Sequence, residues 1–105
     1  MIDEILNEDQ IYYRGTIFTI SYLGDIQERE SFLLTECFED EYVFQIICIS
    51  GYGAGTVQGY IKKGVLAGTH RAITHEELIE GIKYNFLNPD FDSLKIEDEY
   101  NIKFE

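Results

Sequence analysis

Two apolar runs separated by an acidic triplet constrain the fold of this chain more than any other feature. The runs span residues 32–38 and 42–50, and Glu39, Asp40 and Glu41 lie between them. Both runs are rich in β-branched and aromatic residues, which favour strands. Two such runs joined by a short polar segment predict a β-hairpin whose turn is centred on Asp40.

The same register predicts which face of the hairpin is buried. With the turn at Asp40, Glu36 lies opposite Phe44, and side chains alternate between the two faces of each strand. The face expected in the core then comprises Phe32, Leu34, Phe38, Tyr42, Phe44, Ile46 and Cys48. Cys37 is expected on the opposite face, so the register predicts that it forms no intramolecular disulfide with Cys48.

Further strands are predicted from composition and alternation over residues 12–23, 56–62 and 94–104. Phe18, Ile20 and Tyr22 share one face of the first of these strands. In the last, the expected inner face consists of Leu94, Ile96, Tyr100, Ile102 and Phe104. The charged residues 25–30 are expected to form a connection, and the glycine-rich residues 51–55 are expected to join two strands of a hairpin.

The clearest helix signal begins at Thr74. Thr74 and Glu77 form the pattern of a capping box, in which each side chain bonds the backbone of the other residue. The apolar face that follows contains Leu78, Ile79, Ile82 and Phe86, and Asn88-Pro89 ends the helix. A short helix is also expected near the N-terminus, around Ile2, Ile5 and Leu6. The chain is therefore predicted to be one α+β domain, residues 1–105, with about five mainly antiparallel strands and one main helix on a face of the sheet.

The charge of the chain limits its partners. Twenty acidic residues oppose eight basic ones, which gives a formal net charge of −12. A molecule of that sign repels phosphate backbones, so direct binding to nucleic acid or to an anionic membrane is not expected. A basic protein partner is favoured instead. With no secretory signal pattern, no apolar stretch of spanning length and only two cysteines, the expected location is the cytoplasm.

No residue pattern predicts catalysis or a cofactor. The glycine-rich segment has G-x-G-x-G spacing and leads into a predicted strand, unlike a dinucleotide-binding loop. His70 and His75 lie five residues apart without nearby cysteines, which does not resemble a zinc site. The least weak catalytic set is His70, Arg71 and Tyr60. We expect no enzymatic activity, no metal and no cofactor.

The acidic residues are segregated along the chain. Residues 25–41 carry a net charge of −6, from seven acidic residues and Arg29, whereas residues 42–89 carry +1. Charge that only keeps a domain soluble would be spread more evenly. The candidate partner-binding residues are therefore the exposed acids of this segment with one aromatic anchor from the glycine-rich loop: Asp25, Glu28, Glu30, Glu39, Asp40, Glu41 and Tyr52.

These features resemble those of bacterial immunity proteins of contact-dependent growth inhibition and related polymorphic toxin systems. The resemblance is carried by the acidic 25–41 segment, the IICISGYGAG transition and the THEELIEGIKYNF helix. It implies a cytoplasmic protein that binds and neutralises a toxin domain, often a basic nuclease. The alternative is an acidic regulatory or DNA-mimic protein that occupies a nucleic-acid-binding cleft, and the third possibility is a small enzyme.

Overall fold

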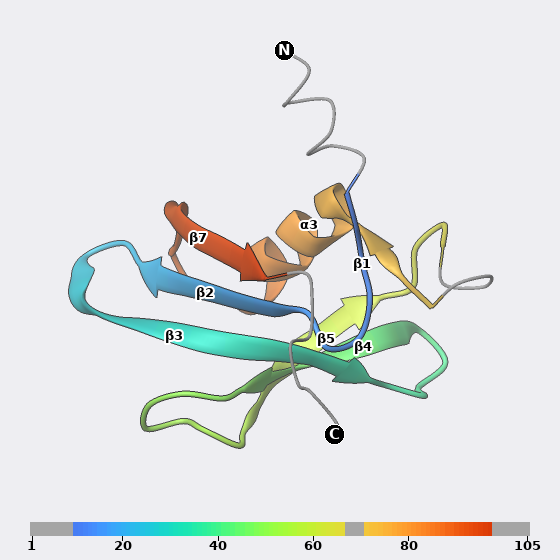
Figure 1. Ribbon diagram of the computed structural model, residues 1–105, viewed down its shortest axis with the longest axis horizontal. Coiled ribbons are helices and arrows are strands. Elements are labelled where there is room, and N and C mark those ends of the chain that lie inside the picture. The colour runs from blue at the N-terminus through green and yellow to red at the C-terminus, as the bar shows by residue number, and fades with distance from the viewer. Residues whose placement is uncertain (1–9, 67–70, 98–105) are drawn as a thin grey trace, which may run out of the picture.

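A computed structural model describes residues 10–66 and 71–97, without the side chains of residues 25–28. It shows a five-stranded antiparallel sheet in the order β5-β4-β3-β2-β7, with one helix packed against it (Figure 1). The strands are β2 (Ile17–Tyr22), β3 (Asp25–Glu36), β4 (Tyr42–Cys48), β5 (Val57–Lys62) and β7 (Pro89–Glu97). The helix is α3 (His75–Asn85), and β1 (Ile11–Tyr12) pairs with β6 (Ile73–Thr74) in a separate two-stranded sheet. The predicted α+β class is confirmed.

The predicted hairpin forms with the expected register. Glu36 pairs with Phe44 and Leu34 pairs with Ile46 across β3 and β4. The face toward α3 is buried, and with residues from β2, β5 and the helix it builds one core, whose members include Phe18, Ile20, Phe32, Leu34, Phe44, Ile46, Cys48, Ile61, Leu78, Ile82 and Phe86. Register is strongly specified here because a slip by one residue would turn this face to solvent.

The hairpin prediction is wrong for three side chains near its turn, one of which is Tyr42: expected in the core, it is only half-buried and lies beside Tyr60. Phe38, expected in the core, is 83% exposed, and Cys37, expected on the opposite face, is buried. The regular part of β3 ends at Glu36, and Arg71 donates hydrogen bonds to the carbonyl groups of Cys37 and Val43. The segment that carries Arg71 thus lies against this end of the hairpin, so Cys37 and Val43 are covered while Phe38 projects outward.

Residues 25–30 belong to a strand, so the prediction of a charged connection is wrong. Tyr22 pairs directly with Asp25, and only Leu23 and Gly24 separate β2 from β3. Gly24 has φ of +86°, a conformation suited to glycine in a tight hairpin turn. The charged residues concealed the strand because strand composition is usually read from apolar and β-branched side chains.

The connections around β5 and β7 agree in part with the prediction. Residues 49–56 join β4 to β5, with positive φ at Gly51 and Gly55. Strand β7 begins at Pro89, five residues before the predicted start at Leu94. Leu94 and Ile96 pack against the core as expected. Tyr100, Ile102, Phe104 and the predicted N-terminal helix lie outside the described residues.

The predicted capping box starts α3. The Thr74 side chain accepts a hydrogen bond from the Glu77 N–H at 3.1 Å, and the Glu77 carboxylate accepts one from the Thr74 N–H at 2.9 Å. Leu78, Ile82 and Phe86 face the sheet and are buried. The sequence therefore predicted both the cap and the buried face of this helix.

Removing the cap hydroxyl is expected to destabilise the protein modestly. Thr74→Ala should lower the free energy of unfolding by about 1 kcal/mol, because one backbone N–H at the start of α3 loses its partner. Urea denaturation followed by circular dichroism measures the change. Thr74→Ser keeps the hydroxyl and should stay near the wild-type value; equal losses in both variants would show that the hydroxyl is not the source of stability.

Candidate partner-binding surface

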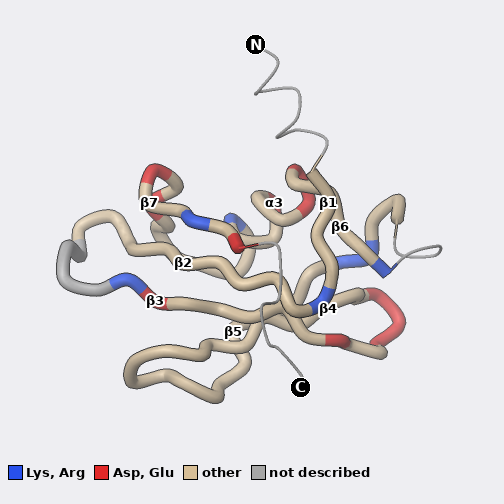
Figure 2. The backbone as a smooth tube through the Cα atoms, in the orientation of Figure 1, with Lys and Arg blue, Asp and Glu red and all other residues tan. Residues whose placement is uncertain are grey.

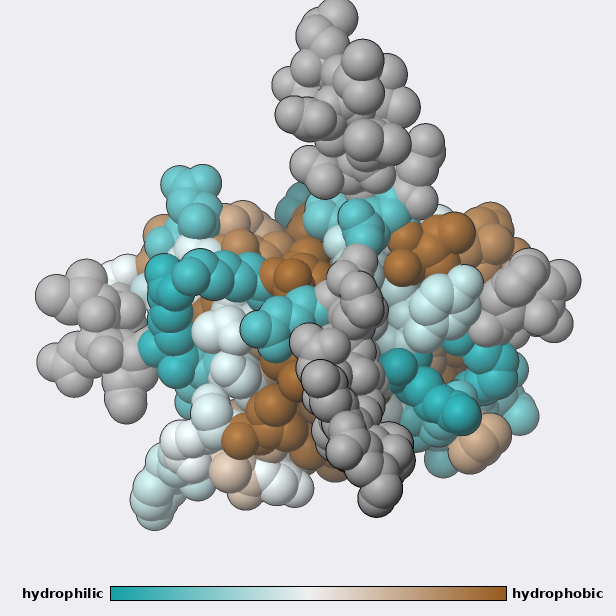
Figure 3. Space-filling model, in the orientation of Figure 1, coloured by the Kyte–Doolittle hydropathy of each residue, from teal (hydrophilic) through white to brown (hydrophobic). Residues whose placement is uncertain are grey.

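The turn between β3 and β4 presents an aromatic side chain among carboxylates. Phe38, Glu39, Asp40 and Glu41 are all exposed, and they follow one another in the chain. Figure 2 shows these acidic positions gathered at the end of the molecule where β3 meets β4. In the space-filling view, hydrophilic side chains cover much of this end of the molecule (Figure 3). We refer to residues 38–41 as the acidic turn.

Arg71 holds the acidic turn in place. Its Nε donates to the Glu36 carboxylate at 2.8 Å, and one terminal nitrogen, Nη2, donates to the carbonyl groups of Cys37 (2.8 Å) and Val43 (3.0 Å). The guanidinium carbon also lies 5.2 Å from the centre of the Phe38 ring. One planar cation therefore joins both strands of the hairpin and contacts the exposed ring, which a lysine ammonium does not reproduce.

Glu36 and the backbone at Arg71 complete this arrangement. Glu36 also accepts from Arg14 at 3.1 Å, so its carboxylate lies between two guanidinium groups. Arg71 has φ of +46°, an uncommon conformation for a residue other than glycine. A residue held in this conformation by several contacts is typical of a segment whose geometry is fixed by its surroundings. The acidic turn is thus presented on a braced hairpin end.

Loss of the Arg71 side chain is expected to destabilise the protein and loosen the turn. Arg71→Ala removes an ion pair that is about one-third exposed and two hydrogen bonds to carbonyl groups, and the free energy of unfolding should fall by about 2 kcal/mol. Arg71→Lys should recover less than half of that loss. Urea denaturation measures stability, and amide hydrogen exchange of residues 37–43 measures loosening. Unchanged exchange in Arg71→Ala would show that Arg71 does not brace the turn.

The structure divides the predicted binding residues between two ends of the sheet. Glu39, Asp40 and Glu41 lie together in the acidic turn, whereas Asp25, Glu28 and Glu30 belong to the first half of β3. At roughly 3.3 Å per residue, the ends of this twelve-residue strand are about 36 Å apart. Tyr52 is fully exposed, but it lies in the β4–β5 loop, at the end of β4 opposite the acidic turn.

Glu30 is engaged within the protein. It pairs with Ile20 in the ladder, and its carboxylate accepts a hydrogen bond from the Tyr22 hydroxyl at 3.0 Å. Burial, together with this bond and the negative charge of Glu30, raises the pKa of Tyr22 far above its ordinary value. Because the folded-state pKa is raised, this contact stabilises the fold below about pH 10 and is lost as pH rises further. The Glu30 carboxylate is therefore already engaged by a side chain of the neighbouring strand β2.

The residues considered for catalysis do not form a site in the described part of the chain. Arg71 is committed to the hairpin, and His70 lies outside the described residues. His75 Nδ1 lies 2.9 Å from the Tyr12 hydroxyl, a contact that ties α3 to β1. Cys37 and Cys48 are buried free thiols. Among the described residues, no group of three or more metal-ligating side chains comes together.

Phe38 and Arg71 were missed as components of the surface. The alternation of residues 32–38 placed Phe38 in the core, and nothing in the sequence links Arg71 to a turn thirty residues earlier. The sequence did contain one signal for this surface, because Phe38 directly precedes three acidic residues and aromatic residues are enriched in protein interfaces.

Comparisons with protein-family models, with curated proteins and with solved structures find no match to this chain. In the described residues, no helix combines the length and apolar character that crossing a membrane requires. The structure itself shows an α+β protein with an exposed acidic turn that Arg71 braces.

Proposed function

We propose that this protein is an immunity protein that binds and neutralises a basic toxin domain through the acidic turn. The observation that carries the proposal is the presentation of Phe38 beside Glu39, Asp40 and Glu41 on a hairpin end braced by Arg71. Aromatic side chains are enriched in protein interfaces, and the rim around such anchors is polar. Bracing lowers the entropy that the turn loses when it binds.

The charge of the acidic turn favours a nuclease as the neutralised toxin. A nuclease presents a positive cleft to phosphate groups, and carboxylates can occupy the same positions. The net charge of −12 attracts such a cleft from a distance and raises the association rate. The Phe38 ring would bury apolar area at the centre of the contact, which slows dissociation.

A second candidate is an acidic regulatory or DNA-mimic protein. Three consecutive exposed carboxylates suit any cleft that binds nucleic acid, so the same surface supports this function with a different target. The nature of the bound protein separates the two candidates: a toxin domain encoded beside this gene supports immunity, and a host DNA-binding protein supports mimicry.

The test is co-purification from the native host, followed by kinetics with the protein recovered. We expect to recover a basic toxin domain. Its association rate should fall at least tenfold as salt rises from about 50 to 500 mM, because salt shortens the distance over which opposite charges attract. An association rate indifferent to ionic strength would contradict the electrostatic mechanism. Recovery of a toxin domain whose activity persists in the complex would contradict neutralisation.

A further inference from the structure

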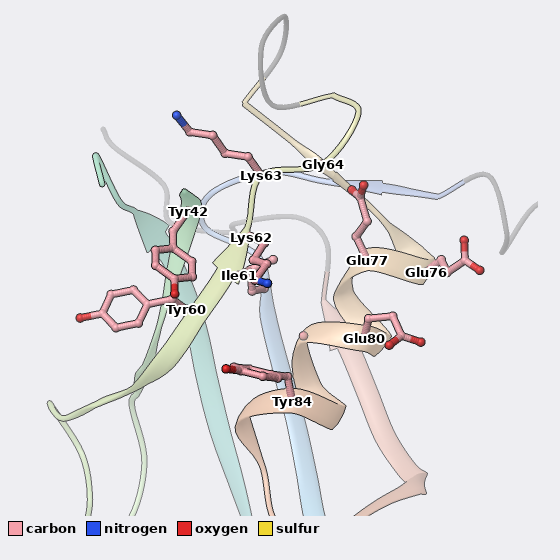
Figure 4. Close-up of a pocket in the computed structure, with 11 residues that line it drawn as sticks. Tyr42, Tyr60, Ile61, Lys62, Lys63, Gly64, Glu76, Glu77, Glu80 and Tyr84 are labelled. Atoms are coloured by element: carbon pink, nitrogen blue, oxygen red, sulfur yellow. The ribbon is translucent and has the colours of Figure 1, made fainter. Parts of the chain in front are cut away.

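A groove of about 370 Å³ lies between β5 and α3, next to the acidic turn. Tyr42, Tyr60 and Tyr84 line it, and Ile61 and Gly81 also border it (Figure 4). The Tyr42 and Tyr60 rings lie 5.2 Å apart, while Tyr84 projects from α3 toward β5 and is 79% exposed. Tyrosines combine large contact area with a polar tip, and they are enriched in protein interfaces.

The two walls of the groove carry opposite charge. Lys62 and Lys63 at the end of β5 form no ion pair among the described residues. On α3, Glu76 is also unpaired, and Glu80 has only an exposed contact of 3.8 Å with Lys83. Two lysines thus lie on one wall and three glutamates on the other, of which Glu77 is engaged by the backbone N–H groups of Val65 and Thr74. This near balance contrasts with the strongly negative molecule as a whole.

The order of residues along the groove makes the face complementary to itself. Asn85 bonds the Tyr60 carbonyl at 2.8 Å, and Glu77 bonds the Val65 N–H at 3.2 Å, so β5 and α3 run in opposite directions. Ile61 lies beside Gly81 between these contacts. With a two-fold axis parallel to the groove, the β5 wall of one copy would lie over the α3 wall of the other. Residues at the same position along the groove would then face each other.

We propose that a second copy of this chain docks on the groove to form a two-fold symmetric dimer. Lys62 and Lys63 of each copy face Glu80 and Glu76 of the other, and Tyr60 of each copy packs near Tyr84 of the other. Two copies with a net charge of −12 repel each other over most of their surfaces, so self-association is least opposed at a face that carries both lysines and glutamates and is close to neutral.

The dimer forms through side chains, without pairing of the β5 edges. The Asn85 side chain donates to the Tyr60 carbonyl and accepts from the Tyr60 N–H at 3.4 Å, so it occupies the position of a neighbouring strand. The Gln58 side chain also bonds the Asn85 carbonyl at 3.1 Å. These contacts close part of an edge that would otherwise attract another strand.

Charge reversal on each wall, separately and together, tests the proposal by analytical ultracentrifugation over a concentration series up to about 1 mM. K62E/K63E and E76K/E80K should each weaken dimerisation at least about tenfold, because attractive pairs become repulsive on both sides of the axis. The combined four-residue variant restores opposite charges and the wild-type net charge, so it should return dimerisation to within about threefold of wild type.

A matched control separates local pairing from net charge. R29E/K95E changes the net charge as much as K62E/K63E does but at exposed positions on β3 and β7, so dimerisation should change less than about threefold. Net charge alone would instead make E76K/E80K associate more strongly than wild type. A wild-type protein that stays monomeric throughout the series overturns the proposal, as does failure of the four-residue variant to recover. In either case a peptide segment of another protein becomes the expected occupant of the groove.

Discussion

Replacing Phe32 with alanine is expected to lower the free energy of unfolding by about 3–5 kcal/mol, because it opens a cavity at the centre of the core. Phe32 is fully buried on β3, the middle strand of the sheet. Its ring stacks on Phe18 with centroids 5.3 Å apart and meets the edge of Phe86 at 4.9 Å. Its loss therefore weakens the contact between the sheet and α3 as well as packing within the sheet.

Urea denaturation followed by circular dichroism measures this effect. Small domains have total stabilities of about 5–15 kcal/mol, so Phe32→Ala should retain only part of the wild-type value or be unfolded at 37 °C. Phe32→Leu keeps much of the volume and should lose less than half as much. Val57→Ala shortens a half-exposed apolar side chain on β5 and should change stability by less than about 0.5 kcal/mol. A Phe32→Ala loss as small as that of Val57→Ala would show that the aromatic cluster does not hold α3 on the sheet.

The parts of the fold that were predictable depend on local patterns with a strong physical cause. The β3–β4 register follows from alternation on both sides of a short turn, and a slip would expose the whole apolar face. The start of α3 follows from the reciprocal bonds of Thr74 and Glu77, which require only residues three positions apart. Both predictions concern residues close in sequence.

The parts that were missed depend on contacts between distant residues. The order β5-β4-β3-β2-β7 places the last described strand beside the first long one, which no local pattern specifies. The first half of β3 was not predicted because it is rich in charged residues. A strand tolerates charged residues when a neighbouring strand supplies its ladder hydrogen bonds. The groove between β5 and α3 likewise exists only because segments twenty residues apart lie side by side.

The candidate site shows the same division. The carboxylates of Glu39, Asp40 and Glu41 were predicted because acidic turns remain exposed in almost any fold. The exposure of Phe38 was not predictable, because it depends on Arg71 reaching the carbonyl groups of Cys37 and Val43 from another part of the chain. Because Phe38, and not Tyr52, adjoins these carboxylates, we propose Phe38 as the anchor in place of Tyr52.

Replacing Phe38 with alanine is expected to weaken binding of the cognate basic partner by about 2–4 kcal/mol, or roughly 30- to 1000-fold in Kd. Phe38 is 83% exposed in the free protein, so its apolar ring gains burial only when a partner covers it. The loss should appear mainly in the dissociation rate, because anchors slow dissociation whereas charges speed association. Stability should fall by less than about 1 kcal/mol, the size of the contact between the ring and Arg71. Surface plasmon resonance and urea denaturation measure the two quantities.

Two further variants separate the roles of ring, charge and position. Glu39→Lys/Asp40→Lys should slow association at low salt and leave the dissociation rate within about threefold of wild type, because exposed charges act mainly through steering. Tyr52→Ala removes an exposed aromatic side chain from the β4–β5 loop, at the end of β4 opposite the acidic turn, and it should leave both rates unchanged. If Tyr52→Ala weakens binding and Phe38→Ala does not, the partner contacts the β4–β5 loop, and the acidic turn is not the binding surface.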